Sequence, residues 1–303
     1  MATNTSRDAA KKAAQSGTMT PRQIWIVLIG LMSGMFLAAL DQSVVGAAMR
    51  TIADDLSGLS LQAWATTAYL ITATVSTPIY GKLGDIFGRR TLFMIAIVIF
   101  IVGSVTSGFA TSMAELAAFR ALQGMGAGGL FSLAFTIVAD IVPPKERAKY
   151  QGMFLAVFGT SSVLGAVVGG ALAGAGEILF IDGWRWIFLM NIPIGAVSLF
   201  MVVKFLHIPN NPRPQKIDWW GAVTIVLAVV PFLLIAEQGR EWGWSSPLAI
   251  AMYVTGVFGI VSFIMIEKRM GSAALIPLSL FKEPTFARTQ ILGFIVGVEC
   301  SAE

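Results

Sequence analysis

The chain has 303 residues, of which 56% are hydrophobic and only 13% are charged, whereas about 25% charged residues is usual for a soluble domain. This composition excludes a soluble globular enzyme and a disordered protein, and it predicts an integral membrane protein with several helical spans. The single histidine, His207, and the single cysteine, Cys300, exclude an intrachain disulfide and a zinc site built from His and Cys. We therefore expect neither a metal site nor an enzyme.

Eight stretches are long and apolar enough to cross a bilayer, which takes about 20 residues of helix. They cover roughly residues 24–49, 56–80, 91–113, 115–139, 150–176, 184–203, 219–236 and 247–266. A ninth apolar run, residues 289–298, has ten residues and is too short to cross. We therefore expect that the chain stops part-way into a ninth helix, as a fragment of a longer protein would.

Basic residues divide unequally between the two sides of these spans. If the N-terminus is cytoplasmic, 17 of the 21 Lys and Arg residues lie in inner segments, and only Arg50, Arg185 and Arg240 lie in outer ones. This asymmetry predicts a multi-pass membrane protein, surrounded by lipid, with its N-terminus in the cytoplasm. It also accounts for the net charge of +4 without a nucleic-acid partner.

The loops and spans predict five parts along the chain. Residues 1–22 are expected to form a cytoplasmic tail, 23–206 a six-helix bundle, 207–218 a cytoplasmic linker, 219–266 a helix pair, and 267–303 a cytoplasmic loop with the truncated start of a second bundle. The linker assignment rests on its polar composition and its three prolines.

Two charged residues, Asp41 and Arg120, fall inside predicted spans. Asp41 lies about 25 Å along the first span, and Arg120 lies roughly 7 Å into the fourth, which runs in the opposite direction. Both should therefore sit at a similar depth in the outer half of the membrane. Each costs about 2.5–3.5 kcal/mol at a helix centre, so such residues normally face a bundle interior or a wet cavity. A buried carboxylate beside a guanidinium can bind and release a proton when its surroundings change. A purely structural ion pair is the alternative.

The segment between the second and third spans reads GKLGDIFGRR. Its motif residues are Gly81, Gly84, Asp85, Gly88, Arg89 and Arg90. The spaced glycines predict a tight turn and a close approach of helices. The two arginines are expected to reach a carboxylate at the inner end of another span, for which Asp140 is the natural candidate. Ion pairs that form in one conformation and break in another would act as a gate. A simple basic turn is the alternative.

This segment closely resembles the loop motif of the major facilitator superfamily. Four other segments resemble motifs of its 14-span drug:proton antiporter family, namely LDQSVV at 40–45, RALQG at 120–124, WRWIFLMNIPIG at 184–195 and PLSLF at 277–281. The resemblance implies an all-α integral membrane fold. The chain would hold the N-terminal six-helix bundle, two extra linker helices inserted after it, and the start of a ninth helix. It also implies proton-coupled multidrug efflux by alternating access between two bundles, and antibiotic resistance.

Glycines recur in the fourth and fifth spans. Gly152, Gly165, Gly169 and Gly170 resemble the antiporter motif of the superfamily, although Ser161 and Ala166 replace a glycine and a proline of that motif. The resemblance implies that this helix packs tightly and favours export over uptake. A GxGxxG match at 124–129 lies inside a span, so we interpret it as a helix-packing surface rather than a nucleotide site.

The resemblance also implies lipophilic and often cationic substrates, such as drugs, dyes or quaternary ammonium compounds. A pocket for these compounds needs a carboxylate and aromatic faces. The candidate lining residues are Asp41, Trp64, Tyr69, Phe131 and Phe135. Gln123 and Asn191 either line the same cavity or join helices. The chain has no Walker A sequence, so we expect a proton gradient, and no cofactor, to supply the energy.

Two other functions remain open at this point. One is an uptake permease for a small nutrient, against which the fifth span and the inserted helix pair count. The other is a non-transporting membrane protein, such as a truncated product or a regulatory partner of a complete carrier, which the short ninth run favours.

Overall fold

The structure, a computed structural model, describes residues 21–143, 145–206, 218–271 and 274–302. The chain divides into two compact units, residues 1–213 and 214–303, and each is described by itself. The predicted tail lies outside the described residues except for its last two, and the predicted linker lies outside them except for Asp218. The predicted domain boundaries therefore stay predictions.

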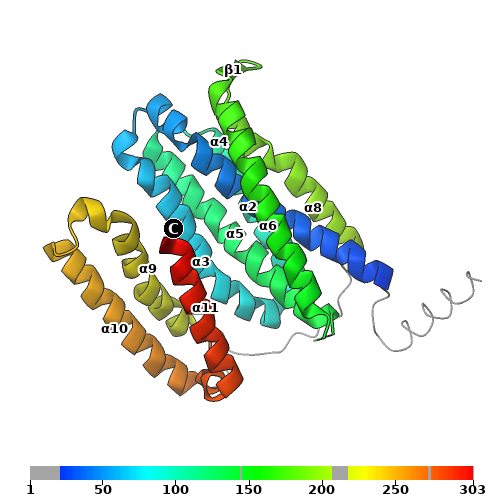
Figure 1. The fold of residues 1–303 in the computed structure, drawn as a ribbon, viewed down its shortest axis with the longest axis vertical. Helices are drawn as coiled ribbons and strands as arrows, with labels where there is room; N and C mark the ends of the chain where they lie inside the picture. The colour runs from blue at the N-terminus through cyan, green and yellow to red at the C-terminus, as the bar shows by residue number, and fades with distance from the viewer. Residues whose placement is uncertain (1–20, 144, 207–217, 272–273, 303) are drawn as a thin grey trace, which may run out of the picture. The chain divides into compact units, whose positions relative to one another are not determined.

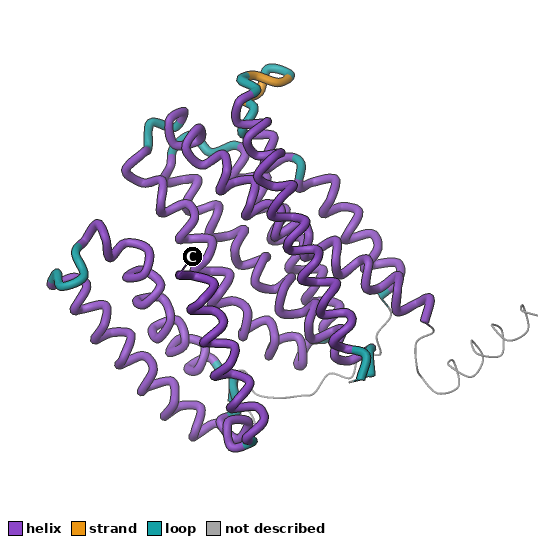
Figure 2. The backbone as a smooth tube through the Cα atoms, in the orientation of Figure 1, coloured by secondary structure: helices purple, strands orange, loops and turns teal. Residues whose placement is uncertain are grey.

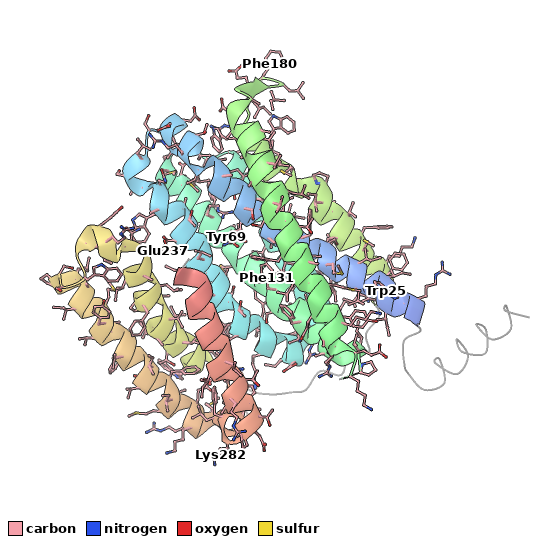
Figure 3. The ribbon with its side chains drawn as sticks, viewed as in Figure 1. Trp25, Tyr69, Phe131, Phe180, Glu237 and Lys282 are labelled. Atoms are coloured by element: carbon pink, nitrogen blue, oxygen red, sulfur yellow. The ribbon has the colours of Figure 1, made fainter. Side chains whose placement is uncertain are left out.

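The first unit is a bundle of helices (Figure 1). Its helices are α2 (Pro21–Asp55), α3 (Gln62–Phe87), α4 (Arg89–Gly108), α5 (Met113–Ile141), α6 (Arg147–Gly174), α7 (Arg185–Leu189) and α8 (Asn191–Phe205), with a 3₁₀ turn η1 at Leu59–Leu61. Each of the first six predicted spans appears as a helix, the sixth in two pieces. An unpredicted hairpin of β1 (Glu177–Ile178) and β2 (Ile181–Asp182) follows α6, as Figure 2 shows, with Phe180 exposed at its tip (Figure 3).

Helix α3 differs from the predicted second span. It begins at Gln62 and continues through Phe87, so Gly81, Gly84 and Asp85 are helical rather than part of a turn. The turn consists of one residue, Gly88, whose φ of 97° places it in the left-handed region. Only glycine adopts that region without a steric cost. One such residue is enough to end α3 and start α4.

Seven of the described helices are long and apolar enough to cross a membrane, against the eight that we expected. The difference is α3, in which threonines and a serine between residues 66 and 77 lower the mean hydropathy. Its 26 residues nevertheless extend about 39 Å. Its main neighbour in the bundle is α5.

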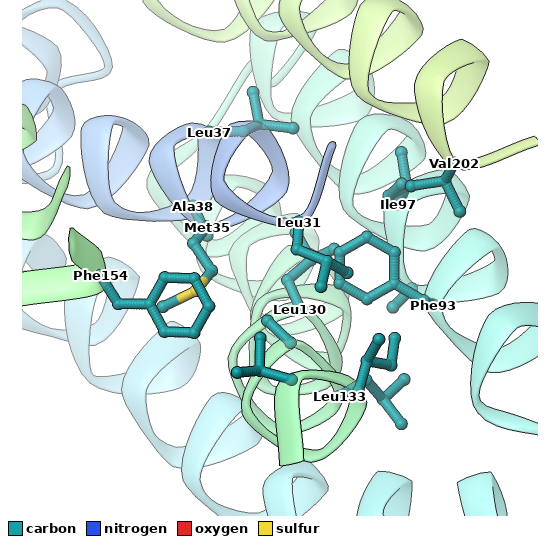
Figure 4. Close-up of a cluster of buried hydrophobic side chains, with 14 of the residues drawn as sticks. Leu31, Met35, Leu37, Ala38, Phe93, Ile97, Leu130, Leu133, Phe154 and Val202 are labelled. Carbon is teal, nitrogen blue, oxygen red and sulfur yellow. The ribbon is translucent and has the colours of Figure 1, made fainter. Parts of the chain in front are cut away.

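The core of the first unit forms around α2, α4 and α5 (Figure 4). Leu31, Phe93 and Leu130 are completely buried there. In a bilayer, helices associate through close packing, because lipid is as apolar as the side chains. The glycines of α5 allow this packing, since a Cβ at Gly126 would come within 2.5 Å of the Phe100 nitrogen of α4. The helix-packing interpretation of the GxGxxG match is confirmed.

The second unit contains α9 (Trp219–Trp242), α10 (Pro247–Met270), the 3₁₀ turn η3 (Leu278–Lys282) and α11 (Pro284–Ala302). Asp218 caps α9 by accepting a hydrogen bond from the Gly221 nitrogen at 2.7 Å, and Ser246 caps α10. Near the end of α10, the buried carboxylate of Glu267 accepts hydrogen bonds from the backbone nitrogens of Leu275 and Ile276 at 3.2 and 3.0 Å. These bonds attach the following loop to the helix pair.

The ninth apolar run lies in a helix, as expected, but the helix is longer than the run. Helix α11 has 19 residues rather than ten, and is about 28 Å long. It begins at Pro284, because proline is well tolerated at the first position of a helix. The polar residues that follow Pro284 continue the helix into the apolar run.

Candidate functional site

Asp41 of α2 and Arg120 of α5 form a buried ion pair in the first unit. Nη1 of Arg120 lies 2.5 Å from Oδ2 of Asp41, and their side chains are 1% and 0% exposed, respectively. The two intramembrane charges thus meet, as their predicted similar depth requires, whereas their place in the outer half of the membrane stays a prediction. Because each charge has lost its water, the pair depends on its mutual attraction and on further hydrogen bonds.

Two amide side chains supply those hydrogen bonds. Nε2 of Gln123 donates to Oδ1 of Asp41 at 2.9 Å, and Oε1 of Gln123 accepts from Nη1 of Arg120 at 2.9 Å. Nδ2 of Asn191 donates to Oδ1 of Asp41 at 2.6 Å and to Oγ of Ser104 at 2.8 Å. Both amides are buried. The sequence left two roles open for these amides, lining the cavity or joining helices, and in the structure they join helices.

The network reaches further than the predicted residues. The hydroxyl of Ser104 in α4 donates to the carbonyl of Phe188 in α7 at 2.8 Å, so five helices meet around Asp41. Sequence reasoning missed Ser104 and the Phe188 carbonyl. A serine inside an apolar span was the available signal for Ser104, whereas no sequence signal marks a backbone carbonyl.

Tyr69 is the one predicted aromatic liner that contacts the ion pair. Its ring lies 4.1 Å from Cζ of Arg120, and its buried hydroxyl is 3.4 Å from the Ala38 carbonyl. A guanidinium over an aromatic face is a favourable arrangement. Tyr69 thus packs against Arg120, near the middle of the first unit (Figure 3).

The structure does not bring the other three liners to Asp41. Phe131 and Phe135 pack against Phe158 and Phe154 of α6, with ring centroids 6.5 and 5.2 Å apart. Trp64 is partly buried near the start of α3. Substrate contact by these residues stays a prediction.

Arg89 makes the ion pairs of the GKLGDIFGRR motif. Its Nη1 forms an ion pair with Asp140 at the end of α5 and donates to the Thr136 carbonyl at 2.7 Å. Its Nη2 donates to Oδ1 of Asp85 at 2.8 Å. The predicted contact between Arg89 and Asp140 is confirmed.

Contrary to the prediction, Arg90 contacts no carboxylate among the described residues. Its Nη2 instead donates to the Val203 carbonyl near the end of α8, at 2.6 Å. The expectation for the glycines holds at Gly84, where a Cβ would lie 2.8 Å from the Leu133 side chain of α5, whereas the nearest atom to a Cβ at Gly81 is 3.6 Å away.

We expect Asp140→Asn to lower the unfolding temperature in detergent more than Asp85→Asn does. Both carboxylates pair with Arg89, but Asp85 is four residues away in sequence, whereas Asp140 joins α4 to α5. The pair with Asp140 is partly exposed, so its loss should cost about 1 kcal/mol at most. Thermal melts of both variants test this, and equal or reversed shifts would contradict it.

The four glycines of the antiporter motif do not act alike in α6. A Cβ at Gly165 or Gly169 would collide with Ser43 or Val44 of α2, only two and three residues beyond Asp41. A Cβ at Gly152 or Gly170 would have nothing within 4 Å. Tight packing is therefore confirmed for Gly165 and Gly169, whereas Gly152 and Gly170 have no close neighbour in the part of the chain that the structure describes.

Residues 31–297 match the family model described as Major Facilitator Superfamily. Multidrug resistance protein 3 of Bacillus subtilis is 38% identical over 272 residues, which are 89% of this chain and 52% of that protein. Multidrug transporter protein MdtP of Bacillus subtilis is 35% identical over 288 residues, 95% of this chain and 52% of that protein. The chain thus spans about half the length of these relatives.

Solved structures agree at the level of the fold. The proton:xylose symporter XylE bound to 6-bromo-6-deoxy-D-glucose superposes with a TM-score of 0.56 at 17% identity, over 82% of this chain and 53% of that chain. At this identity the likeness shows the fold alone. Because the family model covers most of the sequence, this multi-pass membrane chain belongs to the Major Facilitator Superfamily of transporters.

Proposed function

We propose that the chain serves proton-coupled multidrug efflux, as a member of the 14-span drug:proton antiporter family. The observation that carries this proposal is the buried ion pair of Asp41 and Arg120, which is held by amides from two helices. The names of the two Bacillus subtilis relatives, a multidrug resistance protein and a multidrug transporter, support the substrate class.

The chemistry of the pair suits exchange of a proton for a cation. While Asp41 is ionised, its negative charge balances the positive charge of Arg120. Protonation of Asp41 removes the negative charge and leaves a buried guanidinium beside a neutral group. This costs several kcal/mol and drives rearrangement of α2 against α5. A lipophilic cation beside Asp41 would supply the same charge as the proton. A proton and a cationic substrate therefore compete for one carboxylate, and the exchange couples their movements.

The remaining parts of the molecule take supporting roles in this proposal. The Arg89–Asp140 pair acts as the cytoplasmic gate, and the seam of Gly165 and Gly169 holds α6 against the part of α2 next to Asp41. The protein lies in the cell membrane among lipids with its N-terminus in the cytoplasm, as the distribution of basic residues favours. The proton gradient supplies the energy, and neither a cofactor nor nucleic acid takes part.

Reconstitution of the chain in proteoliposomes tests the proposal. The probe is a fluorescent lipophilic quaternary ammonium dye, and its movement is followed with an imposed pH gradient and again after an uncoupler has removed the gradient. We expect dye and protons to move in opposite directions, and dye movement to stop with the uncoupler. Co-movement of solute and protons would indicate an uptake permease instead. No dye-dependent proton flux would indicate a non-transporting protein.

A further inference from the structure

Within the described residues, the polar side chains in contact with the Asp41 carboxylate (those of Arg120, Gln123 and Asn191) all donate hydrogen bonds to it. Arg120 has no acceptor, so the Gln123 oxygen must face Arg120 and the Gln123 nitrogen must face Asp41. The Phe188 carbonyl can only accept, so the Ser104 hydrogen points to it and the Ser104 oxygen is left to accept from Asn191. The amide orientations are therefore fixed by their second partners, and the arrangement fits an ionised Asp41.

A protonated Asp41 would need an acceptor that this arrangement does not offer. Arg120 cannot accept, and the Gln123 oxygen is held by Arg120. Asn191 contains the remaining candidate, because its Oδ1 is buried and has no hydrogen-bond partner among the described residues. Rotation of the Asn191 amide by half a turn would exchange its oxygen and nitrogen. The amide oxygen would then accept a hydrogen bond from the protonated oxygen of Asp41.

This rotation would also change the partner of Ser104. The Ser104 oxygen would lose the hydrogen bond that it now accepts from the Asn191 nitrogen. It would face the Asn191 oxygen instead, and the Ser104 hydroxyl hydrogen can turn toward that oxygen. The bond from Ser104 to the Phe188 carbonyl would then break. That carbonyl lies at the junction between α7, which ends at Leu189, and α8, which begins at Asn191.

We propose that Asn191 is a positioning residue that reads the protonation state of Asp41 and transmits it through Ser104 to the junction of α7 and α8. The inference rests on the proposed function, in which Asp41 binds the coupling proton. It adds a route by which that proton changes the contact of α4 with α7. No covalent bond other than that of the proton to Asp41 forms or breaks, and only hydrogen bonds are exchanged.

The charged and titratable groups around Asp41 are few. Arg120 of α5 pairs with it, and Tyr69 of α3 is the other titratable group that interacts with both members of the pair. Arg185 of α7 is directed instead at Asp182 and at the carbonyls of Gly108 and Ala110. Among the recorded contacts of the described chain, α4 and α8 present only uncharged groups, Ser104 and Asn191, to this network.

An infrared pH titration of the purified 303-residue chain in detergent tests the inference without requiring transport. The carbonyl band of a protonated carboxylic acid is followed against pH and assigned to Asp41 by its absence in Asp41→Asn. We expect Asn191→Leu to raise the pH midpoint by about one unit, because a hydrogen bond to a charged group is worth more than one to a neutral acid. Size-exclusion chromatography shows whether each variant is folded.

Ser104 provides the sharper test, because it does not contact Asp41. Ser104→Ala removes the acceptor that fixes the amide, so Asn191 can turn freely toward a protonated Asp41 and the midpoint should rise. In a protein that already carries Asn191→Leu, Ser104→Ala should cause no further change of the midpoint, since Ser104 acts through Asn191. The matched control is Ser107→Ala, in the same helix and equally buried, whose hydroxyl bonds to the Gly103 carbonyl of its own helix at 2.7 Å. It should leave the midpoint unchanged.

Two results of these titrations would overturn the relay, and a third would contradict the proposed function. An unchanged midpoint in Ser104→Ala, or additive shifts in the double variant, would overturn the relay while leaving Asp41 as the proton site. A band that persists in Asp41→Asn would show that another carboxyl takes the proton, which contradicts the proposed function itself. Ser104→Ala removes a single oxygen, so it decides the matter even if Asn191→Leu does not fold.

Discussion

The variant Asp41→Asn is expected to lose pH-driven dye transport completely. Exchange of one proton for one monovalent dye cation moves no net charge, so the imposed pH gradient alone drives it. One pH unit is worth about 1.4 kcal/mol, which sustains roughly a ten-fold gradient of the dye. An amide of the same shape cannot bind or release that proton, so the gradient reached by the variant should fall to about one. Proteoliposomes with an imposed pH gradient give the measurement. Asp54→Asn is the matched control, because Asp54 lies in the same helix in an exposed pair with Arg50.

A folding defect must be separated from a loss of coupling in this experiment. Removing one member of a buried ion pair typically costs 3–5 kcal/mol, because the other charge is left unpaired. The double variant Asp41→Asn/Arg120→Gln removes both charges and should recover part of that stability. It should still not transport against a gradient. Gradient-driven transport by a folded protein without Asp41 would remove this residue from the mechanism.

The ion pair was predictable from the sequence, because a charge in a membrane span needs a partner and two antiparallel spans bring the charges to one depth. The sequence also named Gln123 and Asn191 as candidates, but their hydrogen bonds to the pair were not predictable. Whether Asn191 faces Asp41 or the surface depends on how α8 is rotated about its axis, and packing against α2 and α4 decides that rotation. Apolar composition places a helix along the membrane normal but leaves its rotation open.

The motif around Gly88 has a second feature that the sequence does not determine. Glycine spacing predicted both a tight turn and a close approach of helices, but it did not say which glycine has which role. Gly84 has the second role and Gly88 the first, as its φ of 97° shows. Sequence alone does not distinguish a glycine that bends the backbone from one that leaves room for a neighbour such as Leu133.

The antiporter glycines of α6 fall on two different faces of the helix. At 100° per residue, Gly165 and Gly169 lie one turn apart on one face, which is the face that meets α2. Gly152 and Gly170 are 18 residues, or five full turns, apart, so they share another face, about 140° from Gly165. The motif therefore contains two surfaces, of which the first unit uses one. This division could have been read from the spacing.

The variant Gly165→Leu should separate α6 from α2 and abolish transport. Its Cβ alone would lie 3.1 Å from the Val44 nitrogen, and closer still to the side chain of Ser43, before the rest of the side chain is added. The obstacle includes helix backbone, which cannot move aside as a flexible side chain can, so the cost should reach or exceed the 1–3 kcal/mol usual for overpacking. Because Ser43 and Val44 follow Asp41 closely, the strain falls on the helix segment that holds the proton site.

Gly170→Leu is the matched control, since it adds the same side chain to the same helix where nothing lies within 4 Å. Unfolding temperature and dye flux should fall in Gly165→Leu and stay near wild-type values in Gly170→Leu. Equal damage from both substitutions would mean that α6 is sensitive to bulk on every face. Full activity of Gly165→Leu would mean that the seam between α2 and α6 opens without consequence, and the close approach next to Asp41 would then have no part in coupling.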